Sequence, residues 1–175
     1  MTWRGATTTQ ERLLSCLPYI LPLLNALPFG GFLFNQFPPL AWLFLPISLL
    51  APIYYAGGGG LAIVPILVFI GLIVGVVRNN RIRHLIRYNA MQAILIGFAL
   101  ALVRMLLLLM DIVNAAVLSP IVGNAIPEAN LFIIVLFDVL FLGSVGIVVY
   151  SVVQSLRGHH AEVPVISDAA YSQTR

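Results

Sequence analysis

The stretch RNNRIRHLIRYNAMQAILIGFALALVRMLLLLMD, residues 78–111, decides the fold because a basic loop runs directly into a long apolar segment. Four of the nine cationic residues, all of them Arg, fall within its first ten positions: Arg78, Arg81, Arg83 and Arg87. Short loops rich in Arg remain on the cytoplasmic side of a bilayer. These four arginines therefore predict a membrane protein, and they determine its topology.

The composition supports the same class of protein. Hydrophobic residues make up 61% of the chain, charged residues only 9%, and the mean hydropathy is +1.03. The net charge of +3 comes mostly from one loop that lacks interleaved aromatics, so we expect no nucleic-acid partner. Glu11 and Arg12 immediately precede the first apolar run, and we expect neither a cleavable signal peptide nor a transit peptide. The sequence therefore predicts an all-α integral membrane protein.

Residues 11–29, ERLLSCLPYILPLLNALPF, carry a narrow polar stripe. Glu11, Ser15, Tyr19, Pro22 and Asn25 recur every three or four positions, the spacing of one helix face. Three prolines also fall in this segment, and an interfacial helix tolerates them better than an isolated span because water can reach the freed carbonyls. We expect an amphipathic helix at the membrane surface. A spanning helix is the alternative.

Charge and hydropathy together predict four spans, at residues 38–55, 61–77, 86–110 and 130–153, followed by a cytoplasmic tail at 158–175. Trp42, Tyr54 and Tyr55 lie near the ends of the first span, where amphipathic rings prefer the headgroup level. The loop at 111–129 contains no cation and is expected outside. Both termini then lie on the cytoplasmic side. A fifth crossing would place Arg12 outside, against the charge rule.

Small residues mark two candidate helix-packing faces. Gly71 and Gly75 form a G-x-x-x-G pair in the second span, and Ala93, Gly97 and Ala101 form a stripe in the third. Small side chains allow membrane helices to approach closely. The alternative is that such spacings arise by chance in apolar helices that are rich in glycine.

Arg104 and Asp138 lie inside the third and fourth predicted spans. A charge at the bilayer centre costs roughly 2.5–3.5 kcal/mol on insertion scales, so it usually faces a partner or a wet cavity. Counted from the outer ends of their helices, the two lie about 10 and 12 Å deep, nearly level. This predicts an intramembrane ion pair between them. Snorkelling toward Asp111 and the polar lining of a substrate path are the alternatives.

Catalytic and metal-binding patterns point to no enzyme. His159, His160 and Glu162 lie together in the tail, but adjacent histidines do not easily ligate one ion. Cys16 is the only cysteine and has no nearby base in the sequence. We therefore expect no catalytic residues, no metal and no cofactor.

Three stretches carry a family resemblance: ERLLSCLPYILPLLNALPFG at the start, the basic loop leading into RYNAMQAI, and the tail EVPVISDAAYSQ. They resemble the Tic-twenty family, the small multispanning subunit of the protein-import translocon of the chloroplast inner envelope. The resemblance implies four spans with both termini on the stromal or cytoplasmic side. Without an expected transit peptide, the chain is similar to the cyanobacterial or plastid-encoded members.

The resemblance implies a channel or channel-associated subunit that helps form a membrane path for polypeptide or another polar solute. The alternative is a structural accessory subunit that docks on a larger membrane complex or assists its assembly. Expected partners are the lipid bilayer, other membrane subunits or further copies, and a polypeptide substrate. The expected location is a bacterial plasma membrane or plastid inner envelope, with the thylakoid membrane as a further alternative.

Overall fold

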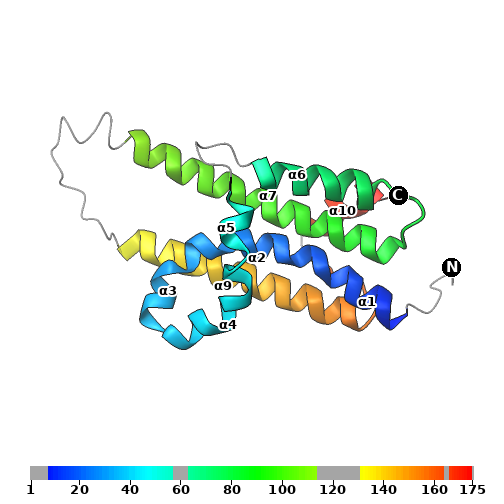
Figure 1. Cartoon of the computed structure of the whole chain (residues 1–175), viewed down its shortest axis with the longest axis horizontal. Coiled ribbons are helices and arrows are strands. Elements are labelled where there is room, and N and C mark those ends of the chain that lie inside the picture. The colour runs from blue at the N-terminus through cyan, green and yellow to red at the C-terminus, as the bar shows by residue number, and fades with distance from the viewer. Residues whose placement is uncertain (1–7, 57–62, 114–130, 164–165, 175) are drawn as a thin grey trace.

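The computed structural model describes residues 8–56, 63–113, 131–163 and 166–174. Within these ranges all regular secondary structure is helical, as predicted (Figure 1). Most of the predicted outer loop at 111–129, and the glycine run at 57–60, lie outside the described residues.

Two long apolar helices form the frame of the bundle. α7 (His84–Val113) has 30 residues and α9 (Leu131–Leu156) has 26, and their predicted equivalents were 86–110 and 130–153. At about 1.5 Å per residue each exceeds the roughly 30 Å of a bilayer's hydrocarbon core. By length and composition, both can cross a membrane.

The amino-terminal segment is a third helix of spanning length, 28 residues from Thr9 to Gln36. It consists of α1 (Thr9–Cys16), η1 (Leu17–Tyr19), α2 (Ile20–Ala26), η2 (Leu27–Gly30) and α3 (Gly31–Gln36). A capping box between Thr8 and Glu11 starts it. Pro18 and Pro28 fall in the first turns of the two 3-10 segments, where the missing N–H removes no helical hydrogen bond. The prolines therefore tighten this helix without ending it.

This amino-terminal helix packs against both α7 and α9 (Figure 1). At one end of the bundle, Arg12 donates a 3.3 Å hydrogen bond to the Leu156 carbonyl. At the other end, the ring of Phe29 packs edge-on against Phe137, with centroids 5.4 Å apart. The segment expected at the membrane surface thus runs along the inside of the bundle. Its polar stripe meets polar groups of the neighbouring helices, which explains how it can be buried.

Between the amino-terminal helix and the basic loop, the chain forms shorter pieces. The predicted span at 38–55 is divided into α4 (Pro38–Ser48), which contains Pro46, and α5 (Ala51–Tyr54), with a turn between them. The predicted span at 61–77 corresponds to α6 (Ile63–Leu72) and the π-helical η3 (Ile73–Val77). Each piece is shorter than a bilayer is thick.

Two apolar clusters hold these elements together. One joins the amino-terminal helix to α4, α7 and α9 around Phe29, Phe44 and Phe141. The other joins it to α5, η3 and α7 around Leu24, Tyr54 and Ile94. The carboxy-terminal helix α10 (Ile166–Thr174) packs against α7.

Candidate functional site: a buried polar cluster at the basic end of the bundle

The bundle contains a group of polar side chains that are 0–1% exposed. We call it the polar cluster. Its members come from the amino-terminal helix, the start of α7 and the end of α9: Ser15, Tyr19, Tyr88, Asn89, Gln92, Ser151 and Ser155. Buried polar groups are costly unless they are hydrogen-bonded, so their partners determine what the cluster can do.

Gln92 connects the amino-terminal helix to the tail. The Tyr19 hydroxyl donates a 2.7 Å bond to Gln92 Oε1, and Gln92 Nε2 donates a 3.3 Å bond to the Ala161 carbonyl. The Tyr88 hydroxyl donates to the same carbonyl at 2.8 Å. Two side chains of α7 therefore hold one backbone position of the segment that follows α9.

Asn89 connects the amino-terminal helix to α9. Its Nδ2 donates 2.6 Å to Ser155 Oγ and 3.2 Å to the Ser15 carbonyl. Ser155 in turn donates to the Ser151 carbonyl one helical turn earlier. Asn89 Oδ1 and Ser151 Oγ are buried without a hydrogen-bond partner. The other amide and hydroxyl groups of the polar cluster bond backbone carbonyls or one another, so little polar surface is left free.

A second set of contacts fixes the tail just outside the polar cluster. His84 Nδ1 and His160 Nε2 lie 3.1 Å apart, and the His160 ring packs edge-on against Tyr88. The Ser167 hydroxyl accepts a 2.6 Å bond from the Val163 backbone N–H, at the start of α10. The contacts of His160 with His84 and Tyr88 dock the tail segment onto the first turns of α7, and the bond between Val163 and Ser167 fixes the turn within the tail.

The three stretches that carry the family resemblance meet at this site. The opening stretch supplies Ser15 and Tyr19, RYNAMQAI supplies Tyr88, Asn89 and Gln92, and the tail motif begins one residue after Ala161. In the sequence these three segments carry the family resemblance, but we predicted no role for their polar residues. A signal was present: Asn89 and Gln92 are uncharged polar residues three positions apart in an apolar helix, hence on one face.

Arg78, Arg81, Arg83 and Arg87, the four arginines of the basic loop, lie at the same end of the bundle. Arg83 forms a 2.9 Å ion pair with Glu11, and Arg87 Nε donates to the Val77 carbonyl at 2.7 Å. Arg78 and Arg81 are exposed. The basic loop thus has two arginines with structural contacts and two that face outward.

The two candidate packing faces differ in their surroundings. Ala93 is fully buried, and a Cβ added at Gly97 would lie 3.2 Å from Asn25 and 3.4 Å from Leu21. This face therefore packs closely against the amino-terminal helix, while Ala101 is exposed. A Cβ at Gly71 or Gly75 would meet nothing within 4 Å.

Arg104 and Asp138 do not form an ion pair in this structure, although the sequence led us to expect one. The Arg104 guanidinium lies 4.9 Å from the centre of the Tyr55 ring, and Asp138 Oδ1 is buried without a hydrogen-bond partner. The physical reason is that the amino-terminal helix packs against both α7 and α9, while α5 brings Tyr55 to α7. The sequence argument assumed direct contact between the two long helices.

The described residues contain no group of three or more His, Cys, Asp or Glu side chains able to hold a metal ion. Around the polar cluster the chemistry is that of amides, hydroxyls and backbone carbonyls. Such an arrangement fixes helices relative to one another.

With three long apolar helices and shorter apolar ones, the chain is a multi-pass helical membrane protein. The family model described as "Chloroplast import apparatus Tic20-like" matches residues 8–170, and the chain belongs to this family. This is the Tic-twenty family that the sequence motifs resemble.

Relatives from cyanobacteria, plants and red algae are similar along nearly the whole chain. A "Tic20 family protein" of Synechocystis sp. is 43% identical over 166 residues, covering 95% of this chain and 94% of the relative. "Protein TIC 20-II, chloroplastic" of Arabidopsis thaliana is 32% identical over 174 residues, covering 95% and 74%. "Tic20 family protein Ycf60" of Porphyra purpurea is 28% identical over 180 residues, covering 98% and 79%.

Proposed function

We propose that this chain is a membrane-embedded subunit of a protein-translocation assembly, and that the path for the polypeptide forms between copies of the chain or with partner subunits. The family description, an import apparatus, supports the first part. The polar cluster supports the second. Its side chains bond backbone carbonyls and one another and are closed off from solvent, so they do not line a continuous water-filled passage.

The proposed orientation follows from which elements meet at the basic loop. The Glu11–Arg83 ion pair and the Arg12–Leu156 hydrogen bond bring the start of α1, the start of α7 and the end of α9 to one level. We assign this level to the cytoplasmic side because its loop is rich in Arg. The amino-terminal helix then crosses outward, the pieces from α4 to η3 return together, α7 crosses outward and α9 returns. This topology has four crossings with both ends on the cytoplasmic side, as the sequence led us to expect. Its first crossing, however, is the segment 9–36.

The experiment is purification from the source membrane in mild detergent, followed by separation of monomer from larger species. Each fraction is reconstituted into planar bilayers. We expect conductance from a homo-oligomeric fraction or from a fraction with membrane partners, and none from the monomer. Robust conductance from a demonstrated monomer would contradict the shared path. A non-conducting, stoichiometric large complex would favour the accessory-subunit alternative.

A further inference from the structure

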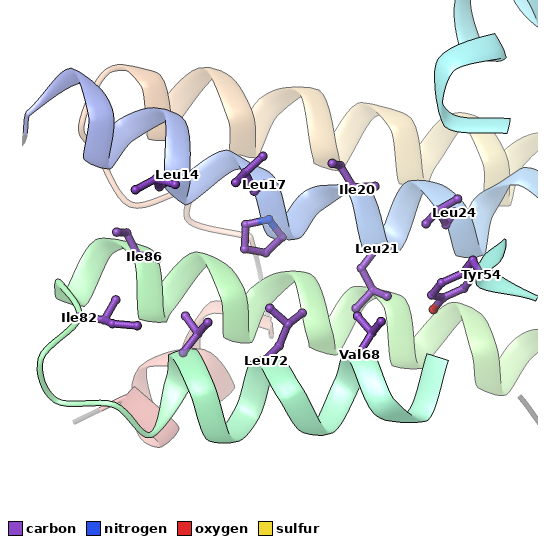
Figure 2. Close-up of a pocket in the computed structure, with 12 residues that line it drawn as sticks. Leu14, Leu17, Ile20, Leu21, Leu24, Tyr54, Val68, Leu72, Ile82 and Ile86 are labelled. Carbon is purple, nitrogen blue, oxygen red and sulfur yellow. The ribbon is translucent and has the colours of Figure 1, made fainter. Parts of the chain in front are cut away.

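An open apolar cavity of about 520 Å³ lies between the amino-terminal helix on one side and α6, η3 and the start of α7 on the other (Figure 2). We call it the apolar groove. Its lining runs from Ile82 and Ile86 at the basic loop to Leu24 and Tyr54 farther along the bundle. Ligand sites of this size, about 300–1,000 Å³, normally contain a few polar groups that orient a polar ligand. The lining here is Leu, Ile, Val, Pro and one Tyr, so it suits a hydrocarbon chain.

The basic end of the groove has unneutralised positive charge. Arg78 lies two residues after the lining residue Val76, and Arg81 immediately precedes the lining residue Ile82. Both arginines are exposed, and the nearby carboxylate of Glu11 pairs with Arg83. Arginines beside a groove between membrane helices, on the cytoplasmic side, are the arrangement that binds anionic lipid headgroups.

The size of the groove favours a lipid chain over a protein segment. A helix with its side chains is about 10 Å wide and would need a groove of that width along the roughly 30 Å core. A single acyl chain is thinner and flexible. Charge and shape therefore point to the same occupant, with its headgroup at the loop and its chain along the helices.

We propose that the apolar groove binds an anionic phospholipid, with one acyl chain between the amino-terminal helix and α6 and the phosphate at Arg78 and Arg81. The bound lipid then joins α6 and η3 to the amino-terminal helix at a place where the protein leaves a space. This inference rests on the groove and its charges, and it holds whether or not the chain conducts polypeptide.

The test uses the full chain, purified and delipidated in mild detergent. Phosphatidylglycerol and phosphatidylcholine with identical acyl chains are added separately, and retained lipid is counted by native mass spectrometry while the melting temperature is followed. We expect phosphatidylglycerol to be retained at one molecule per chain and to raise the melting temperature more than phosphatidylcholine. Because the headgroup contact is electrostatic, we expect this preference to shrink in high salt.

Two kinds of variant locate the site. The double change Arg78→Gln and Arg81→Gln should weaken phosphatidylglycerol binding roughly thirtyfold, as expected for two basic residues at a membrane surface. Arg157→Gln, an exposed arginine after α9, is the matched control and should change it little. Val68→Trp fills the groove and should reduce retention of both lipids. Val74→Trp, at a 59% exposed position that does not line the groove, should not.

Equal retention of the two lipids, or an unchanged preference in the double arginine variant, would overturn the proposal. A photoreactive side chain placed at Val68 in the native membrane adds an independent readout. Crosslinks to lipid support the proposal, whereas crosslinks to a second copy or to a translocating polypeptide would overturn it. The arginine changes lie on the surface, so this part of the test does not depend on how the core tolerates Val68→Trp.

Discussion

Asn89 connects three helices within the polar cluster. It is fully buried and donates to Ser155 in α9 and to the Ser15 carbonyl in α1. Leucine has the same branched heavy-atom shape but cannot donate, so Asn89→Leu leaves buried acceptors without this donor. We expect the free energy of unfolding to fall by about 1–3 kcal/mol.

Thermal and denaturant unfolding of the purified protein in detergent measures this loss. Asn80→Leu is the matched control, because Asn80 is exposed in the basic loop and should change stability by less than about 0.5 kcal/mol. Equal losses from the two changes would mean that the amide bonds of Asn89 contribute nothing specific.

Arg104 has two candidate partners, and a pair of double-mutant cycles distinguishes them. The structure places its guanidinium over Tyr55, a contact that should contribute about 0.5–2 kcal/mol. We therefore expect coupling between Arg104→Leu and Tyr55→Leu, and additive losses for Arg104→Leu with Asp138→Leu. Strong coupling in the second cycle would restore the ion pair predicted from the sequence.

At the scale of elements, local composition predicted some helices and not others. α7 and α9 are long uninterrupted apolar runs next to clear charge signals, so their approximate positions follow from the sequence alone. The amino-terminal helix is different. A polar stripe that contains Ser15 and Tyr19 has the same pattern whether it faces water or the amides of another helix. Only the positions of Asn89 and Gln92 in three dimensions distinguish the two environments.

The docking of the tail on α7 should depend on pH. His84 Nδ1 and His160 Nε2 are 3.1 Å apart, so one neutral ring can donate to the other, whereas two protonated rings repel. Burial, together with the nearby Arg87 cation, lowers the pKa of His84 from the usual histidine value of about 6.5, so acidification below that value should loosen the segment that leads into α10. We expect lower hydrogen-exchange protection factors for residues 166–174 at about pH 5.5 than at about pH 7.5.

His160→Gln should remove most of this pH dependence, because a glutamine cannot acquire a charge. His159→Gln is the control, since His159 is an exposed neighbour outside the pair. Protection factors that are unaffected by pH in the wild-type protein would show that the histidine pair does not control the tail.

At the scale of the whole molecule, the three segments with the family resemblance meet at one end of the bundle. The opening helix, the start of α7 and the tail bond one another there, although they are more than 60 residues apart in the chain. Hydropathy could not predict this convergence, because it depends on which helices become neighbours. They meet at the level of the basic loop, where Arg83 pairs with Glu11 and Arg87 bonds the Val77 carbonyl.

The last prediction concerns the path of the chain through the bilayer. In a Cys16→Ser background, single cysteines are introduced by Asn80→Cys, Glu162→Cys and Gln36→Cys, all at exposed positions. We expect the first two to react with a membrane-impermeant maleimide only from the cytoplasmic side, because they lie at the basic end. Gln36→Cys should react only from the opposite side, because the amino-terminal helix runs the length of the bundle before it ends at Gln36. Labelling of Gln36→Cys from the cytoplasmic side would instead place residues 9–36 at the interface, and labelling of Glu162→Cys from outside would contradict four crossings.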